Sequence, residues 1–360
     1  MPEGSFSAFQ LCYTAALMAH SAIVGFGVYI PKYRIKTADI AKHWEQDPAA
    51  LRSSLGVEEK SVPGKDEDSF TLAFEAATVA LETSGIPSSQ ISAIFVGSES
   101  HPYAVKPTSG MLVSALKLDP FSHAADLEFA CKAGTAGMQI VDSFIRSGQV
   151  SYGLAIGTDT AQGKPGDALE YTAGAGAAAM LLGPANDKKA ICRIEKTLSF
   201  TTDTPDFWRA ANETYPRHAG RFTGEPGYFH HMRETVRAIV EVAKIKMEEI
   251  DHVVFHMPNA KFPLKIAKEC GITKEQLKTG FVVPEIGNTY SACSMIGLAR
   301  VLEEAKKDQK ILLVSYGSGA GCDAFLLTML KNGKALPPDD REHQYLSYSE
   351  YLEHSHALIA

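Results

Sequence analysis

Cysteine is scarce in this sequence, and its spacing excludes two common uses of the residue. The 360 residues contain six cysteines, with no CxxC pair and far too few for a disulfide-built secreted scaffold. They are Cys12, Cys131, Cys192, Cys270, Cys293 and Cys322. We therefore expect free thiols in a protein of the reducing cytoplasm. No metal site is expected either, because His230 and His231 are adjacent and cannot turn both rings to one side of a helix.

Positive charge is also in short supply. The formal net charge is −7, and no local cluster of lysine and arginine offsets it. The sequence therefore lacks the basic surface that a phosphate backbone requires, which argues against nucleic acid as a partner.

Charge of either sign is missing between residues 5 and 30, a pattern that invites a signal-peptide or membrane interpretation. A signal peptide needs a positively charged start, whereas Glu3 is the only charged residue before this stretch, and polar residues and glycines interrupt it. We instead predict a buried strand and turn at 22–30 and no membrane segment. Residues 1–18 are then a dispensable extension, and Met18 is a candidate natural start.

The sequence repeats itself at a nearly fixed distance. A helix, turn and strand around Ile91 match the same elements around Ile250, at an offset of 159 residues. A second match pairs the strand end, helix and strand around Cys131 with those around Asn288, at an offset of 157 residues. Two such matches indicate a duplicated architecture, in a chain long enough for two fused cores.

The predicted architecture is α/β, with two similar halves. Alternating helices and continuous apolar strands indicate parallel sheets that helices cover on both faces. We place the first half at 19–188 and the second at 189–335. One long doubly wound sheet is the alternative. Residues 336–360 are predicted to be a polar, tyrosine-rich tail without a chemical role.

Cys131 stands where a segment end meets the start of a helix rich in small residues. Unpaired N–H groups and the positive end of the helix dipole favour a thiolate at such a position, and the small residues leave room for a substrate. Most free cysteines are buried and inert, which is the alternative here. The position favours Cys131 as a nucleophile.

Three polar residues are predicted at the same edge as this thiol. His256 ends a strand, and Asn288 occupies in the second half the place of Cys131. Glu99 follows the strand that duplicates the His256 strand, so it should reach the other side of one pocket, where partial burial would raise its pKa. Each residue taken singly has a simpler alternative. His256 would then be a satisfied polar residue, Asn288 a turn residue and Glu99 a solvated loop charge.

Two glycine-rich stretches, at 172–177 and 316–321, are not phosphate loops. The first lacks a strand-GxGxxG-helix context, and the second lacks a lysine followed by serine or threonine. The second instead fits a close backbone approach to a thioester, where an N–H could join that of Cys131 in an oxyanion hole. Candidate substrate-binding residues in these stretches are Thr172, Ser318 and Gly319.

The motifs around these residues together resemble the hydroxymethylglutaryl-CoA synthases of the thiolase superfamily, and in particular their archaeal branch. The resemblance spans about residues 23–330. It rests on the motifs Glu128–Thr135, Phe255–Pro258, Gly287–Tyr290 and Ser315–Gly319, with Tyr29–Pro31, Gly157–Thr160 and Asp206–Arg209 in support.

This resemblance implies a thiolase-like αβαβα layered fold and a reaction on CoA thioesters without a cofactor. Cys131 would take the acetyl group from acetyl-CoA, and Glu99 would remove a proton from its methyl group. The enolate would attack the ketone of acetoacetyl-CoA, and water would free the product of this mevalonate-pathway step. His256 would polarise the acetoacetyl carbonyl, and Asn288 would hold that histidine or the substrate.

The resemblance also implies binding partners. Lys261 and Lys265 are candidates for the CoA phosphates, with a solvated helix face as the alternative. The family implies a homodimer, and its archaeal members resemble components of a larger assembly with acetoacetyl-CoA thiolase and a small zinc-ribbon/OB-fold protein.

One departure from the family and three rival interpretations accompany this expectation. The bacterial enzymes carry an active-site tyrosine where this chain has Ala161-Gln162-Gly163, so substrate contacts there are not carried over. A ketoacyl synthase III-like enzyme, a thiolase and a non-catalytic scaffold are the rivals. Glu99 argues against the first, because a decarboxylating enzyme removes no methyl proton, and Gly321-Cys322 is weak support for the second.

Overall fold

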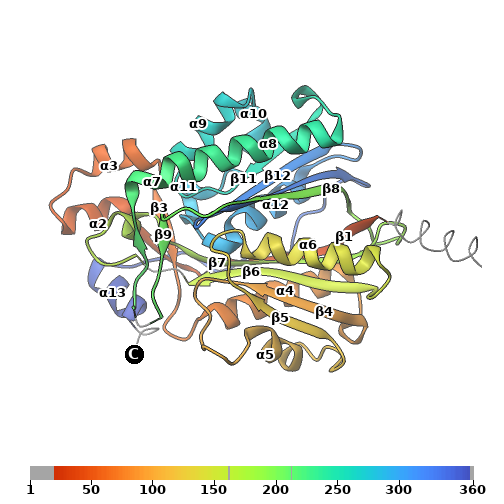
Figure 1. Ribbon diagram of the computed structural model, residues 1–360. Helices are drawn as coiled ribbons and strands as arrows, with labels where there is room; N and C mark the ends of the chain where they lie inside the picture. The colour runs from red at the N-terminus through yellow and green to blue at the C-terminus, as the bar shows by residue number, and fades with distance from the viewer. Residues whose placement is uncertain (1–19, 161–162, 212, 357–360) are drawn as a thin grey trace, which may run out of the picture.

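The computed structural model describes residues 20–160, 163–211 and 213–356. Its centre is a nine-stranded sheet in the order β11-β12-β13-β8-β1-β7-β6-β4-β5 (Figure 1). The first half of the chain supplies β1 (Ser21–Tyr29), β4 (Ile91–Gly97), β5 (His123–Leu127), β6 (Tyr152–Thr160) and β7 (Ala175–Pro184). The second half supplies β8 (Cys192–Thr201), β11 (His252–Phe255), β12 (Lys310–Gly317) and β13 (Gly321–Met329). The strand predicted at 22–30 is confirmed, whereas the extension at 1–18 lies outside the described residues.

Helices form three layers around these strands. One outer layer holds α4 (Ser69–Ser84) and α5 (Thr108–Ala115), and the other holds α8 (Phe229–Ala243) and α9 (Lys261–Glu269). Between them lie α6 (Ala133–Arg146) and α12 (Cys293–Glu304), in a core cluster that takes residues from both halves. The predicted αβαβα order is confirmed, with α8 above the strands and α4 below them in Figure 1.

The two halves repeat one strand pattern. In the first half β4 and β6 are parallel, while β7 is antiparallel to both β6 and β1. In the second half β11 and β12 are parallel, while β13 is antiparallel to both β12 and β8. The halves join through the short pairing of β1 with β8, where Ala22 faces Arg193 and Ile23 faces Cys192.

The prediction of parallel sheets is wrong, because both halves are mixed. Continuous apolar sequence reports that a strand is buried, and it does not report the strand's direction. The turn between β12 and β13 spans only Ser318–Ala320, so these strands must run in opposite directions. The predicted limit between the halves, at residues 188 and 189, stays a prediction.

Small residues let the outer helix approach its sheet. β7 is alanine-rich and almost wholly buried. A side chain at Gly27 of β1 would collide with the backbone of α4 at Ala76, so glycine permits the contact. The helix itself starts at a capping box between Asp68 and Thr71.

Shorter elements complete the fold. They are β2 (Tyr33–Lys36), α2 (Thr37–His43), α3 (Pro48–Leu55), β3 (Glu59–Val62), β9 (Phe207–Trp208), β10 (Arg217–His218), α7 (Gly220–Phe222), α10 (Lys274–Lys278), α11 (Val283–Ile286), β14 (Gln344–Tyr345) and α13 (Tyr348–His356). No helix within the described residues is both long and apolar enough to cross a membrane.

The end of the described chain packs into the fold, so it is more than the polar tail predicted for residues 336–360. β14 pairs with β2, and α13 inserts Tyr348 and Tyr351 into a buried cluster. The Tyr348 hydroxyl donates to the Glu170 carboxylate at 2.8 Å. The Lys60 ammonium donates to the Tyr351 hydroxyl at 3.0 Å and to the Glu170 carbonyl oxygen at 2.5 Å. The tyrosines of the tail therefore serve as hydrogen-bond partners of buried charges.

Lys60 makes the stability of this region depend on pH. Burial lowers the pKa of Lys60 to about 7. Above that pH the folded protein releases a proton that the unfolded chain keeps, so the free energy of unfolding rises with pH. Lys60→Met should remove this dependence. We expect the wild type to gain up to about 1.4 kcal/mol per pH unit relative to the variant between about pH 7 and about pH 8.5, as measured by urea unfolding.

The control is Lys65→Met, because Lys65 is exposed and pairs with an exposed Glu353. It should leave the slope unchanged. Equal slopes for the wild type and Lys60→Met would contradict the assignment.

Candidate active site

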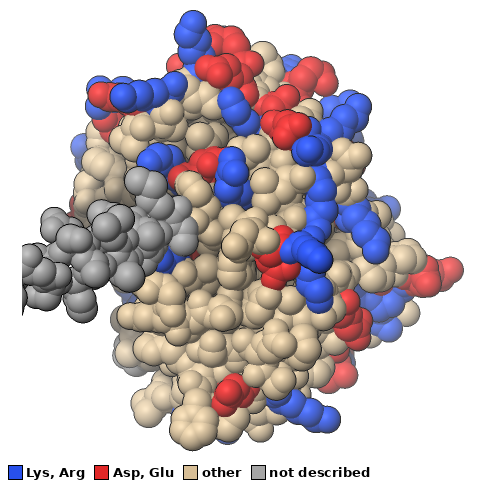
Figure 2. Space-filling view, turned by 90° about the vertical axis from the view of Figure 1, so that its right-hand side faces the viewer, with Lys and Arg blue, Asp and Glu red and all other residues tan. Residues whose placement is uncertain are grey.

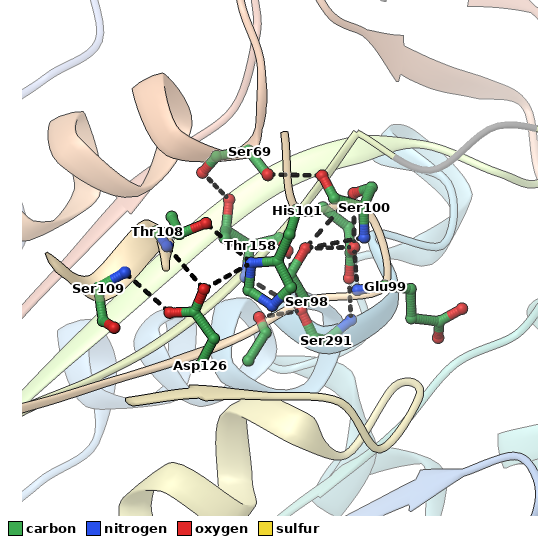
Figure 3. Close-up of polar contacts among 12 residues, drawn as sticks. Ser69, Ser98, Glu99, Ser100, His101, Thr108, Ser109, Asp126, Thr158 and Ser291 are labelled. Atoms are coloured by element: carbon green, nitrogen blue, oxygen red, sulfur yellow. Dashed lines mark hydrogen bonds and ion pairs between the residues drawn. The ribbon is translucent and has the colours of Figure 1, made fainter. Parts of the chain in front are cut away.

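The thiol of Cys131 and the carboxylate of Glu99 meet at the edge of the sheet. Cys131 lies just before α6, and Glu99 follows the end of β4. The Cys131 Sγ donates to Glu99 Oε1 at 3.4 Å. Figure 3 shows the Glu99 side chain pointing away from the polar cluster formed by its neighbours Ser98 and Ser100. The structure thus brings together Glu99 and Cys131, which the sequence places in two separate repeated units of the first half.

A missing side chain makes this meeting possible. A Cβ atom at Gly97, the last residue of β4, would collide with the backbone of Ala133 at the start of α6. Glycine therefore lets the helix start rest directly on the strand end. Glu99, two positions after the strand, is then within reach of Cys131, two positions before the helix.

Asp159 fixes the segment that carries Glu99. Its Oδ1 accepts from the Glu99 N–H at 2.7 Å and from the Ser98 and Ser100 hydroxyls at 2.9 and 2.7 Å. Its Oδ2 accepts from the N–H of Ser291, in the second half, at 2.9 Å. Asp159 is fully buried. It therefore ties the Glu99 segment to the opposite half, with four donors offsetting the cost of burial.

Burial governs the protonation of both reactive groups. It raises the pKa of Glu99 well above its ordinary value, and the nearby Asp159 adds to this effect. The prediction that burial raises the pKa of Glu99 is confirmed. Burial, followed by the charge of Glu99, also raises the pKa of the Cys131 thiol. The expectation of a thiolate is wrong here, because one helix terminus does not outweigh desolvation and the charge of Glu99.

His256 follows β11 and is almost fully buried. The backbone N–H of His256 donates to the Val314 carbonyl oxygen at 2.9 Å. Ser315 follows Val314 on β12, and its hydroxyl donates to the Cys131 carbonyl oxygen at 3.4 Å. Burial lowers the pKa of His256 to about 3, so the ring is neutral. Within the described chain the His256 Nδ1 has no hydrogen-bond partner.

Asn288 and Thr172 lie side by side. The Asn288 N–H donates to the Thr172 carbonyl oxygen at 2.7 Å, and the Gly174 N–H donates to the Asn288 carbonyl oxygen at 2.8 Å. The side-chain Oδ1 of Asn288 accepts from the Tyr290 N–H at 2.9 Å. That oxygen is therefore engaged by Tyr290 rather than by His256.

A cavity of about 690 Å³ opens beside Glu99, and Cys131, His256, Asn288 and Thr172 are not among the residues that line it. Its lining includes Glu99, Phe129, Arg209, Tyr290, Ser318 and Gly319. The Gly319 N–H is occupied, because it donates to Asp206 at 2.8 Å. Of the two amides, that of Ser318 is therefore the remaining candidate to join the Cys131 N–H as an oxyanion donor.

Of the predicted site residues, only Glu99, Ser318 and Gly319 line this cavity. Lys261 and Lys265 are exposed on α9 and are not among the residues that line it. The departure at Ala161-Gln162-Gly163 cannot be placed, because residues 161 and 162 lie outside the described chain.

A buried ion pair next to the thiol escaped prediction. The Lys132 ammonium lies 3.0 Å from the Asp323 carboxylate of β13, and both residues are buried. Asp323 also accepts from the hydroxyls of Thr135 and Ser199. Only a lysine among the small residues of a helix start hints at such a pair in the sequence. For Asp159 the hint is an acid at the end of an otherwise apolar strand.

Comparison with known proteins identifies relatives of this arrangement. Residues 125–198 match the family model described as 3-oxoacyl-[acyl-carrier-protein] synthase III, and residues 240–329 match the model of its C-terminal part. A structure titled HMG-CoA synthase complexed with CoA superimposes with a TM-score of 0.84 at 25% identity, over 93% of this chain and 90% of that chain. A 3-oxoacyl-[acyl-carrier-protein] synthase III from Aquifex aeolicus gives 0.78 at 26% identity, over 86% and 99%.

Curated relatives decide between these two activities. The hydroxymethylglutaryl-CoA synthase of Archaeoglobus fulgidus is 49% identical over 94% of this chain and 99% of its own length. That of Methanothermobacter thermautotrophicus is 51% identical over 92% and 97%. With about half of its residues shared over almost the full length of these enzymes, the chain belongs to the hydroxymethylglutaryl-CoA synthase family.

Proposed function

We propose that Cys131, Glu99 and His256 carry out the reaction of this family in three separate roles. The activity is the condensation of acetyl-CoA with acetoacetyl-CoA to give 3-hydroxy-3-methylglutaryl-CoA. The observation that carries the assignment is the 3.4 Å contact between Cys131 Sγ and Glu99 Oε1. A base so close to the thiol is within reach of the methyl group of an acetyl chain held on that sulfur.

In the first step Cys131 attacks the thioester carbon of acetyl-CoA. The new S–C bond replaces the bond to CoA, and the thiol proton leaves with the CoA sulfur, so no proton is left on the enzyme. The N–H groups of Cys131 and Ser318 are the proposed donors to the oxyanion. Desolvation holds the thiol neutral until the substrate is bound, which suits a nucleophile that should not react with other electrophiles.

In the second step Glu99 removes a proton from the acetyl methyl group. The S–H of Cys131 lowers the pKa of Glu99 in the free enzyme. Acetylation removes this donor, so Glu99 becomes a stronger base once its substrate is in place. The reaction itself thereby tunes the base for its step.

In the third step the enolate attacks the ketone carbon of acetoacetyl-CoA. His256 is neutral and buried, so it polarises the ketone by donating a ring N–H rather than as a cation. Glu99 returns its proton to the alkoxide. Water then cleaves the Cys131 thioester: its oxygen bonds to the acyl carbon, one of its protons returns to the Cys131 sulfur, and the other passes to solvent as the carboxylate forms. Asn288, Thr172, Ser318 and Gly319 are the proposed substrate contacts, and Lys261 and Lys265 remain proposals for the CoA phosphates.

The division of roles is tested by Glu99→Gln. The amide cannot accept a proton, so condensation should fall by at least about a hundredfold, within the range of general acid–base catalysis. Acetylation should stay within about threefold of the wild type, because that step leaves no proton on Glu99. Intact-mass measurement of the acetyl adduct and product formation from both CoA thioesters give the two readings.

Two variants serve as controls. Cys131→Ala should form no adduct at all. Glu82→Gln, which changes an exposed glutamate of α4, should affect neither reading. Equal loss of both steps in Glu99→Gln would contradict its role as the base for the methyl group.

We further propose a homodimer, in which the exposed β5 pairs with its copy. β5 is the last strand of the sheet, and its first residues are exposed. Phe121, just before it, is 94% exposed. The first half also forms the lower part of the face in Figure 2, which carries few charges. An unpaired edge beside an exposed aromatic ring favours a twofold contact.

Two further proposals concern partner proteins and location. The assembly with acetoacetyl-CoA thiolase and a zinc-ribbon/OB-fold protein rests on the resemblance to archaeal enzymes alone. A cytoplasmic location is supported by the five described cysteines, all of which are free thiols.

Phe121→Glu tests the dimer. A charge at the centre of the contact should weaken association by about tenfold or more, as for an interface hot spot. Sedimentation velocity over a concentration series measures this change. Val242→Glu is the matched control, since Val242 is 57% exposed on α8 in the other half. A monomeric wild type, or equal dissociation of both variants, would rule out this contact.

A further inference from the structure

A short hairpin from the second half overhangs the cavity. Its strands are β9 and β10, in which Trp208 faces Arg217 and Phe207 faces His218. The residue before the hairpin is held by hydrogen bonds. The buried Asp206 accepts from the Tyr316 hydroxyl at 2.7 Å and from the Gly319 N–H at 2.8 Å. The segment that follows β9 is thereby held over Glu99.

Arg209 crosses from this hairpin to the base. Its Nη2 donates to the backbone carbonyl oxygen of Glu99 at 3.0 Å, and both residues line the same cavity. No ion pair of Arg209 is found among the described residues. Its positive charge is therefore uncompensated beside the residue that must act as an anion.

The other charges around Glu99 work in the opposite direction. Burial and then the charge of Asp159 raise the pKa of Glu99, whereas Arg209 lowers it. The titratable or charged groups of the described residues that face Glu99 or share its cavity are Cys131, Asp159, Tyr290, Asp68, His101, Tyr103, Glu128 and Arg209. Arg209 alone in this set carries a fixed positive charge.

We propose that Arg209 is a positioning residue for Glu99, supplying both the N–H donor that holds the Glu99 main chain and the positive charge that favours the carboxylate. The inference rests on the proposed role of Glu99 as the base. A buried carboxylate next to a second carboxylate tends to protonate, and a protonated Glu99 cannot remove a proton. One cation at the cavity wall counters that tendency.

Two substitutions separate the charge from the hydrogen bond. Arg209→Gln keeps an N–H donor and removes the charge, whereas Arg209→Lys keeps both. The measurement is the single-turnover rate of product formation from preformed acetyl-enzyme and acetoacetyl-CoA, recorded against pH. The rate falls on the acid side as Glu99 protonates, so loss of a nearby cation moves that fall to higher pH.

For Arg209→Gln we expect the acid limb to move to higher pH, with a loss of about three- to tenfold at its low-pH end. Arg209→Lys should stay within about twofold of the wild type across the profile. The exposed Arg217→Gln is the control, because Arg217 lies in the same hairpin and pairs with Glu213. Added salt should shift the wild type in the direction of Arg209→Gln, since Arg209 is exposed and screened.

An unchanged acid limb in Arg209→Gln, or the same shift in Arg209→Lys, would overturn the inference. Acetylation of Cys131, read by intact mass, reports whether each variant retains a folded site. Glu99→Gln separates the two levels of the argument. If that variant condensed at the wild-type rate, the base assignment would fall. If it were inactive while Arg209→Gln kept the wild-type profile, only the role of Arg209 would fall.

Discussion

The contact between the Cys131 thiol and the Glu99 carboxylate is the constraint on which the rest of the site depends. It exists because a strand end and a helix start touch where Gly97 has no side chain. Neither group would keep its place on a solvated loop. Asp159 holds the Glu99 segment, and the Lys132–Asp323 pair holds the residue next to the thiol. Both sets of interactions include residues of the second half. The second half is therefore needed to position Cys131 and Glu99, which both belong to the first half.

This arrangement sets an electrostatic problem that the fold answers locally. Burial, together with the nearby Asp159, raises the pKa of Glu99, which strengthens the base and also favours its protonated, inactive form. Four hydrogen-bond donors from residues of both halves stabilise the Asp159 carboxylate. His256 has the opposite character, because burial without a charged partner keeps it neutral. The site therefore combines an anion that must stay ionised with an imidazole that must not be.

The repeated elements could be predicted from the sequence, because hydrophobic periodicity indicates which residues are buried, and duplicated elements share their pattern of burial. The sequence placed Cys131 and Glu99 at the correct ends of their elements for the same reason. It could not report strand direction, because β12 and β13 are equally apolar whichever way they run. The tail was misjudged because Tyr348 and Tyr351 look polar until Glu170 and Lys60 are seen to need partners in the core. Asp159 was missed because its partners come from two distant segments.

The glycines that flank the β12–β13 turn show how far positioning extends beyond the reacting groups. Side chains at Gly317 or Gly321 would collide with Phe129, two residues before the thiol. The turn must therefore stay bare for the second half to press against the nucleophile segment, and Lys132 must find Asp323 in the same contact. Separating the halves would expose this apolar contact and leave two buried charges without partners, which is strongly unfavourable. The packing that joins the halves and the geometry that places the thiol are thus one property of the chain.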